Sequence, residues 1–420
     1  MHVQDQGLSA QGLLRAVTMN EDRHVRRLML FFATVYVVEG IGQGRVGIIY
    51  QPINYYLKES GWTPLEVTAY LSLFNFAWVI KPAYGLVSDF VPLFGLRRKS
   101  YLILSSIVAA ASYAWIARLS APSEFAPLFV LTSYAMAMAS TLCGALLAEN
   151  GQKFGLSSAF VNQQWLWFYI AVMASSFAGG ELVQHLTALG SLQAAATIAA
   201  IAPVAMLLAT LYLLDEEKTP INRMEMLRTL KSTVAALTSR KLYVVAAFLF
   251  LYTFAPGFGT PLYYYMTDGL KFSQSYIGIL GSIASAGWIA GALVHRWLLR
   301  STSTKNQLYL SIAIGTLSAA SFLLLSGEVS AAIVNFANGV ALMIGTISTL
   351  ALAAEYCPSR AEGFAFAGLM SIMNLADVFS SNVGAFLYDK VFESHMAPLI
   401  VVSAASTAIC VVLVPLLRLR

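Results

Sequence analysis

The sequence contains little charge, and that scarcity excludes most classes of soluble protein. Only 11% of its 420 residues are charged, whereas 58% are hydrophobic, and the mean hydropathy is +0.68. A soluble protein is roughly 25% charged, so this chain lacks the polar residues needed to cover a soluble surface. The net charge of +5 does not indicate a nucleic-acid partner, because the cations lie in short turns between apolar runs.

Metal ligands and catalytic motifs are also scarce. The three cysteines, Cys143, Cys357 and Cys410, lie in or beside apolar runs without metal-ligand spacing, and they imply no disulfide framework. The five histidines form no HExxH pair, and no GxxxxGK[ST] phosphate-binding loop occurs. No apolar run combines a nucleophile with a base. We therefore expect no metal, no cofactor and no enzymatic activity.

Long apolar runs, in contrast, are abundant. A membrane span needs about 20 mostly apolar residues, and the chain offers about twelve such runs. We expect all of them to be helices, because they are too long for barrel strands. They lie at 28–51, 66–90, 100–119, 124–149, 158–182, 190–214, 242–266, 274–299, 306–326, 329–355, 362–388 and 396–417. The sequence thus predicts an all-α polytopic membrane protein.

The positions of the cations predict how this protein is oriented. With both termini in the cytoplasm of a bacterial-type inner membrane, only four cations fall in external loops and two within spans, namely Lys58, Arg118, Lys271, Lys390, Arg45 and Lys81. The tail 1–27 has no apolar core ahead of its basic cluster, so we do not expect a cleavable signal peptide. A polar cytoplasmic linker, 215–241, separates a bundle at 28–214 from a bundle at 242–420. About six spans on each side is the layout of major facilitator transporters.

Three charges lie away from the ends of the predicted spans of the first half. Glu39 and Arg45 belong to the segment VVEGIGQGRVG, whose glycines allow close helix packing or a local break. They are about 120° apart on an ideal helix, so they need not pair, and Lys81 is a plausible partner for Glu39. These charges either face a central cavity, where they bind an anionic substrate or relay protons, or form a structural ion pair.

A polar stripe marks the run 362–388. Ser371, Asn374, Asp377 and Ser381 recur at spacings of three and four, which places them on one helix face. Because such a stripe is unfavourable in lipid, we expect it to face the other half or an aqueous cavity. Asp377 is our candidate for a proton-binding or substrate-orienting carboxylate, and a hydrogen-bonded seam between helices is the alternative.

The run 242–266 carries helix-breaking residues among aromatics. Pro256 and Gly257 predict a discontinuous helix, a common feature of transporter sites. We expect the tyrosines at 263–265 to belong to an interfacial aromatic belt. Phe254 and Phe258 remain as candidates for cavity residues.

The segment GLVSDFVPLFGLRRK resembles the loop between the second and third helices of the major facilitator superfamily. That resemblance implies that Asp89 accepts hydrogen bonds at the N-terminus of the eleventh helix, near Glu362 and Gly363, and holds the two halves in one state. The gating residues would be Asp89, Arg97, Arg98, Glu149 and Glu355. The alternative is a basic loop that only sets the topology.

Three further segments resemble the folate–biopterin transporter family of this superfamily: QPINYYLKESGWTPLEV, WVIKPAYGLVSD with FGLRRKSYL, and CPSRAEGFAFAGLMSIMN. The chain departs from many members in lacking paired aspartates in the fourth helix, where Ser140 and Gly144 stand. The resemblance implies cation-coupled or facilitated movement of folates, pterins or related compounds. We expect a secondary, proton-coupled, alternating-access transporter for a pterin- or folate-like anion. Its partners would be that substrate, a proton or other coupling ion and the lipid bilayer, and we expect a monomer. Transport of another solute, as by iron-handling magnetosome-type members, or a non-transporting scaffold is the alternative.

Overall fold

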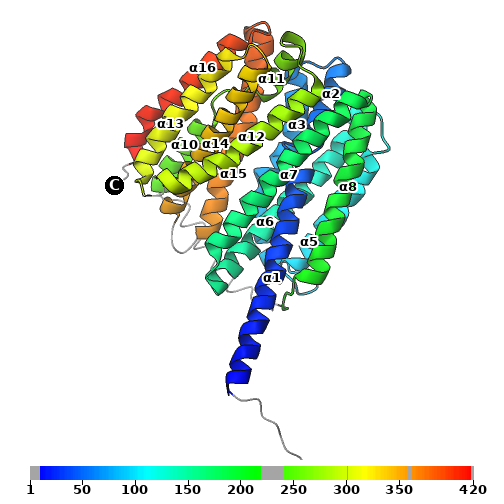
Figure 1. Ribbon diagram of the computed structural model, residues 1–420, viewed down its shortest axis with the longest axis vertical. Coiled ribbons are helices and arrows are strands. Elements are labelled where there is room, and N and C mark those ends of the chain that lie inside the picture. The colour runs from blue at the N-terminus through cyan, green and yellow to red at the C-terminus, as the bar shows by residue number, and fades with distance from the viewer. Residues whose placement is uncertain (1–9, 219–239, 300, 358–361, 418–420) are drawn as a thin grey trace, which may run out of the picture.

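The computed structural model describes residues 10–218, 240–299, 301–357 and 362–417, with side chains from residue 23 onwards except those of residues 158, 362 and 363. Helices account for most of these residues, and no strand occurs among them. Lipid offers no partners for backbone N–H and C=O groups, so the chain satisfies them within helices. The helices form one elongated bundle, and α1 extends beyond it (Figure 1).

The described chain divides into two halves, residues 10–218 and residues 240–417. The N-terminal half contains α1 (Ala10–Gly42), α2 (Tyr50–Glu59), α3 (Pro64–Asn75), η1 (Phe76–Trp78), α4 (Lys81–Phe90), α5 (Lys99–Ile116), α6 (Pro122–Phe154), α7 (Ser157–His185) and α8 (Ala188–Leu213). The C-terminal half contains α10 (Arg240–Thr253), α11 (Gly259–Tyr264), η2 (Tyr265–Gly269), α12 (Gln274–Val294), η3 (His295–Leu299), α13 (Thr304–Ser321), η4 (Phe322–Leu324), α14 (Glu328–Tyr356), α15 (Glu362–Phe386), η5 (Leu387–Val391), α16 (Met396–Ile409) and η6 (Cys410–Leu417). Most of the predicted linker, 215–241, lies outside the described residues.

Within the described residues, nine helices are long and apolar enough to cross a membrane unaided. The predicted runs 28–51, 66–90 and 242–266 are instead interrupted, at 43–49, at 79–80 and at 254–258. In the first interruption the backbone folds back so closely that a Cβ on Gly47 would lie 2.2 Å from the Ile41 carbonyl oxygen. Only glycine fits there. The break at 254–258 contains Pro256 and Gly257, as the sequence predicted.

The start of α3 shows how local sequence sets a helix end. The Thr63 side chain accepts a hydrogen bond from the Glu66 N–H, and the Glu66 carboxylate accepts one from the Thr63 N–H at 2.8 Å. Pro64 occupies the first helical position, where its missing N–H costs nothing. This capping box fixes the N-terminus of α3 at the end of the bundle where the two halves meet most tightly.

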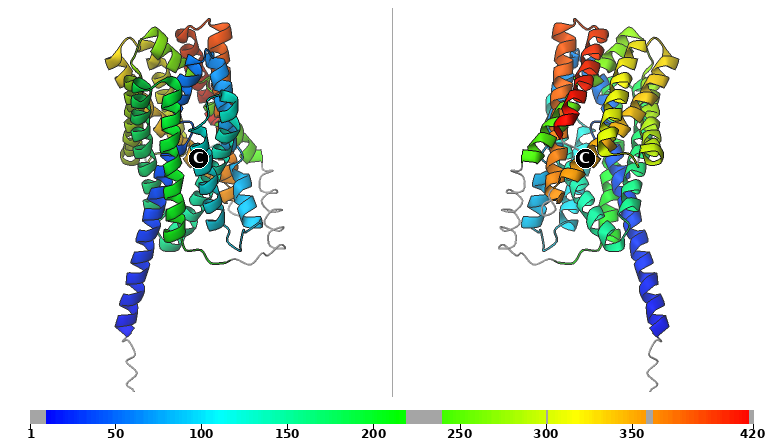
Figure 2. Two further views of the ribbon diagram at one scale, coloured as in Figure 1. Left: turned by 90° about the vertical axis from the view of Figure 1, so that its right-hand side faces the viewer. Right: turned by 90° about the vertical axis from the view of Figure 1, so that its left-hand side faces the viewer.

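The hydrophobic core is divided into three clusters, and their membership shows where the halves are joined. One cluster takes residues from both halves, from Ile48 to Ile400. The second draws only on the N-terminal half, and the third only on the C-terminal half. We call the end of the bundle that carries the shared cluster, with Lys58 and Asp268, the seal end. At the opposite end, Asp89, Arg98 and Glu149 form a cluster of charged side chains. We call this the cluster end, after that charged cluster. Figure 2 shows α1 projecting beyond the bundle there.

Two helix pairs bring the halves together along the length of the bundle. The segment from α3 to α4 lies along α15, and α7 lies along α12. The α7–α12 contact involves backbone, because a Cβ on Gly180 would lie 2.8 Å from the Gly278 Cα atom. Small residues permit such close approach between membrane helices.

Candidate functional site

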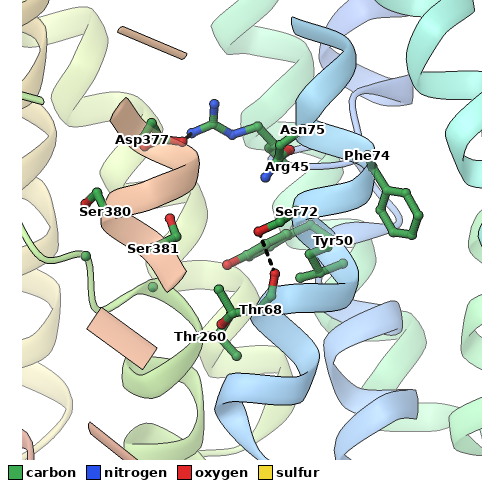
Figure 3. Close-up of a pocket in the computed structure, with 14 residues that line it drawn as sticks. Arg45, Tyr50, Thr68, Ser72, Phe74, Asn75, Thr260, Asp377, Ser380 and Ser381 are labelled. Atoms are coloured by element: carbon green, nitrogen blue, oxygen red, sulfur yellow. Dashed lines mark hydrogen bonds and ion pairs between the residues drawn. The ribbon is translucent and has the colours of Figure 1, made fainter. Parts of the chain in front are cut away.

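A cavity of about 260 Å³ lies between the two halves. Its walls come from the interrupted segments at 43–49 and 254–258, from α2, α3 and α11, and from α15 (Figure 3). The polar and charged residues lining it are Arg45, Tyr50, Thr68, Ser72, Asn75, Thr260, Asp377, Ser380 and Ser381. Helix interruptions leave backbone groups free to bind ligands, and such backbone occurs at membrane depth only where it borders a cavity or protein.

An ion pair between the halves lies in this cavity. Arg45, in the interruption after α1, places a guanidinium nitrogen 2.5 Å from a carboxylate oxygen of Asp377 on α15 (Figure 3). The two side chains are 33% and 31% exposed although they lie in the middle of the bundle. The pair is therefore accessible to solutes that enter the cavity. Because α1 ends at Gly42, the expected angle between Glu39 and Arg45 on one helix does not apply.

Two further members of the predicted polar stripe on α15, Asn374 and Ser381, also face the N-terminal half. The Asn374 amide donates a hydrogen bond to the Trp78 carbonyl oxygen at 2.9 Å. Ser381 lines the cavity. Ser371 is buried, and its hydroxyl has no hydrogen-bond partner among the described residues. Asn382, one turn beyond Val378, donates to the Ser72 hydroxyl at 2.6 Å and extends the polar contact toward the seal end.

The structure brings Glu39 close to Lys81 without joining them in an ion pair. Glu39 is 8% exposed, and its Oε1 atom accepts a hydrogen bond from the Ser140 hydroxyl at 3.1 Å. The Lys81 ammonium lies 4.5 Å from the centroid of the Trp78 ring, at cation–π distance. Glu39 and Lys81 nevertheless act on each other electrostatically. Arg45 is engaged with Asp377 instead.

The aromatic residues of the seventh predicted span lie differently from our expectation. Tyr263 and Tyr264 are 4% and 9% exposed and belong to the core cluster shared by the halves, so the belt assignment is wrong for them. The ring of Phe258 packs against Phe322, with 5.0 Å between centroids, and it is not among the residues that line the cavity. Phe254 stacks on Phe250. Tyr263, Tyr264 and Phe258 thus contribute to packing in or against the core cluster shared by the halves.

At the cluster end, Arg98 gathers most of the predicted gating residues. Its side chain is 7% exposed and contacts Asp89 at 3.0 Å and Glu149 at 3.2 Å. It also donates a hydrogen bond to the Ser88 hydroxyl at 2.5 Å. Arg97 lies 3.9 Å from Asp89 and is 39% exposed. This cluster ties the end of α4 to the end of α6 within one half.

Two other members of the predicted gating set remain apart from this cluster. Glu355 is exposed at the end of α14. The expected contact of Asp89 involves Glu362 and Gly363, where α15 begins, and their side chains lie outside the described set. That contact stays a prediction.

Sequence reasoning missed the acid that holds the start of α5. Glu216, just after α8, accepts hydrogen bonds from the backbone N–H groups of Arg97, Arg98 and Lys99 at 2.9, 3.0 and 2.6 Å. A carboxylate at a helix N-terminus is electrostatically favoured. The sequence does not distinguish Glu216 from the two acids beside it in the polar linker. Its contact could not be predicted, because residues 97–99 are more than 100 positions away along the chain.

Sequence reasoning also missed the polar contacts at the seal end. The Lys58 ammonium lies 2.7 Å from Asp268, and the Tyr264 hydroxyl donates to the Trp62 carbonyl oxygen at 2.6 Å. Asp389 accepts a hydrogen bond from the Leu65 N–H at the start of α3, at 2.8 Å. Each of these contacts joins the two halves. Between described residues, no hydrogen bond or ion pair joins the halves at the cluster end.

Comparison with known proteins assigns this chain to a family. The model of the BT1 family matches residues 43–419. A folate-biopterin transporter of Synechocystis is 26% identical over 381 residues, which cover 86% of this chain and 74% of the relative. A probable folate-biopterin transporter of Arabidopsis thaliana is 27% identical over 387 residues, covering 85% and 75%.

Solved structures agree with the fold. A point mutant of the nucleoside transporter NupG superposes with a TM-score of 0.72 at 16% identity, covering 93% of this chain and 99% of NupG. A D-xylose–proton symporter gives a TM-score of 0.72 at 11% identity, covering 93% and 97%. These relatives are transporters rather than enzymes. With its all-α membrane fold of the major facilitator type, the chain belongs to the BT1 family.

Proposed function

We propose that this protein is a secondary transporter that moves a folate- or pterin-like organic anion by alternating access, coupled to protons. Its relatives named folate-biopterin transporters support the substrate class. The observation that carries the proposal is the Arg45–Asp377 ion pair, since it lies inside the cavity and joins the two halves. The two halves correspond to the moving bundles, 28–214 and 242–420.

Arg45 is the group that recognises the anion. A guanidinium can bind a substrate carboxylate through two parallel hydrogen bonds, and in the present state one of its nitrogens is paired with Asp377. A substrate carboxylate replaces Asp377 and so breaks a contact between the halves. Substrate binding then changes the relative stability of the two conformations, as coupling to transport requires.

The cavity dimensions fit part of such a substrate. Small-molecule pockets usually span roughly 300–1,000 Å³, and this one measures about 260 Å³. It accommodates the carboxylate-bearing end of a folate, which Arg45 binds, rather than the entire molecule. The hydroxyl and amide groups of Tyr50, Ser72 and Asn75 supply hydrogen-bonding partners for the other polar groups of that end.

The pattern of contacts supports one conformation. The seal end is closed by Lys58–Asp268, Leu65–Asp389 and the shared core cluster. Arg45 and Asp377 are each about one-third exposed. Because no hydrogen bond or ion pair between described residues joins the halves at the cluster end, we assign the access route of solvent to that end. With the cluster end in the cytoplasm, together with both termini, this is an inward-facing state of an inner-membrane protein. Tilting of the halves closes the cluster end and opens the seal end.

Uptake by proteoliposomes tests the proposal. Purified protein is reconstituted and offered radiolabelled folic acid, biopterin, riboflavin or uridine in separate assays. We expect the parent to take up folic acid and Arg45→Ala to lose at least about tenfold of that rate. Arg118→Ala is the matched control, because Arg118 is an exposed loop cation, and it keeps the parental rate.

A second variant separates recognition from simple damage. Asp377→Asn leaves Arg45 without its counter-charge, so folic acid binds more tightly and leaves more slowly. We expect a lower KM together with a lower maximal rate. Parental uptake of folic acid by Arg45→Ala contradicts the anion-binding role, and uptake of uridine alone contradicts the substrate class.

A further inference from the structure

Glu39 is the most buried acid of the membrane region and lies outside the cavity that holds the Arg45–Asp377 pair. Its side chain is 8% exposed. Oε1 accepts the hydrogen bond from Ser140, whereas Oε2 is fully buried and has no hydrogen-bond partner among the described residues. Buried polar atoms nearly always have a partner. An unpaired oxygen on a carboxylate is therefore an observation that needs a chemical explanation.

Protonation of Oε2 supplies that explanation. A carboxylate can accept several hydrogen bonds, but this site offers Glu39 only one from a described residue. Burying an anionic oxygen without a partner is costly, and a neutral carboxyl group greatly reduces that cost. Ser140 is a partly exposed residue, and its hydroxyl is the group through which we expect water to exchange protons with the buried carboxyl group.

The surroundings of Glu39 contain one balancing charge. Lys81 on α4 is the charged group that acts on it, and the other titratable groups facing it are Tyr36 on α1 and Cys143 on α6. α7, which packs against another side of α1, presents the Ser175 hydroxyl to the Gly40 carbonyl oxygen. The Lys81 ammonium rests on the Trp78 ring rather than on Glu39. This is the arrangement expected when Glu39 carries no charge.

We infer that Glu39 is the site that binds the coupling proton, and that Lys81 responds to its charge. A proton taken from water converts the Glu39 carboxylate to a neutral carboxyl group, with hydroxide or buffer base left behind. Lys81 then stays on Trp78. When the proton leaves to water, the carboxylate attracts the Lys81 ammonium. Because Trp78 also accepts the hydrogen bond from Asn374 on α15, this movement of Lys81 acts at the contact between the halves.

This assignment gives Glu39 and Asp377 different tasks, and its test by transport rests on the proposed function. Asp377 is paired with Arg45 and exchanges with the substrate. Glu39 has no such pair and exchanges a proton. The assignment is independent of which substrate the cavity takes, so it can be tested without one.

Infrared spectroscopy of reconstituted protein provides the substrate-free test. Difference spectra recorded between mildly acidic and alkaline buffer report the carbonyl stretch of protonated carboxyl groups. We expect the parent to show this band, Glu39→Gln to lose it and Asp377→Asn to keep it. Persistence of the band in Glu39→Gln, or its loss in Asp377→Asn alone, overturns the assignment.

Transport gives the second readout. A gradient of one pH unit supports about tenfold accumulation of folic acid when one proton is coupled. We expect Glu39→Gln to exchange folic acid across the membrane as the parent does, but to accumulate none above the equilibrium ratio. Tenfold accumulation by Glu39→Gln overturns the assignment. If the parent transports no folic acid, the substrate class fails, and the infrared result still decides the role of Glu39.

Discussion

Asp389, at the end of the eleventh predicted span, accepts a hydrogen bond from the backbone N–H of Leu65, at the start of the second, with 2.8 Å between the atoms. A carboxylate at this position interacts with the N-terminus of α3 as well as with one N–H group. Thr63 and Glu66 already cap that helix end from within the N-terminal half. Asp389 thus adds a contact between the two halves, and under the proposed alternating access this contact exists only while the seal end is closed.

Removing the charge of Asp389 weakens the seal. An acid at a helix N-terminus contributes about 0.3–2 kcal/mol, so Asp389→Asn shifts the balance toward the outward-open state by roughly 2- to 30-fold. A cysteine introduced at Thr260, a buried cavity residue near the seal end, then reacts faster with a membrane-impermeant maleimide. Glu393→Gln is the control. Equal labelling of the two variants contradicts a role for Asp389 in the seal.

Arg98 and Arg97 are adjacent cations with very different environments. Arg98→Lys loses the planar fork that reaches Ser88, Asp89 and Glu149 at once. Because both acids are partly exposed, we expect a loss of about 1–3 kcal/mol of stability rather than the full cost of a buried pair. Arg97→Lys, at an exposed position, costs less than about 0.5 kcal/mol. Thermal unfolding in detergent, followed by tryptophan fluorescence, compares the two variants.

Glu216 stabilises the start of α5 through three backbone N–H groups. Glu216→Gln removes the charge that interacts with the helix N-terminus, so we expect a loss of about 0.5–2 kcal/mol. Glu217→Gln changes an exposed neighbour and leaves the unfolding temperature unchanged. If both variants unfold with the parent, the Glu216 contacts contribute nothing measurable.

The contact between α7 and α12 tolerates no added atoms. A Cβ on Gly278 would lie 2.6 Å from the Ser176 carbonyl oxygen and 2.8 Å from the Gly180 Cα atom. Because both obstacles are backbone, Gly278→Ala must separate the helices, at a cost of about 1–3 kcal/mol. Gly144→Ala introduces a methyl group into open space and retains parental stability and uptake. A fully active and stable Gly278→Ala contradicts the close packing.

The orientation of the chain predicts where reporters appear. A reporter fused after Arg420 is expected in the cytoplasm, and so is one inserted near Arg223. Reporters near Lys58 and Lys390 are expected outside, because this orientation places most Lys and Arg residues in cytoplasmic segments, as is usual in membrane proteins. Alkaline phosphatase and green fluorescent protein fusions measure the two locations, and phosphatase activity near Arg223 contradicts the arrangement.

The fold could be predicted from the sequence because apolar runs of span length leave the chain few alternatives. The break at Pro256 and Gly257 was also predictable, since those residues disfavour a continuous helix. The pairing of Arg45 with Asp377 could not be predicted. Both residues were recognised as functional candidates, but their partnership depends on how the two halves lie against each other. The seal contacts of Asp389 escaped notice for the same reason.

Lys81 illustrates the limit for single residues. Placing a charged lysine inside a membrane span costs free energy, so the sequence predicted a functional role for Lys81, with Glu39 as its expected partner. The structure instead shows the ammonium on Trp78. A sequence identifies such a charge, but which neighbour it contacts depends on side-chain positions a few ångströms apart.

The antiparallel course of the segment α3–α4 beside α15 has a consequence for leakage. Each of these two paths ends in an aspartate, Asp389 at the seal end and Asp89 at the cluster end, and Asn374 contacts Trp78 between them. Because α15 and the segment α3–α4 touch near their middle, a tilt of one against the other that separates them at one end must bring them closer at the other end. Under the proposed alternating access, opening one end then brings the opposite ends together, and we expect no continuous pore through which protons could cross the membrane down their gradient.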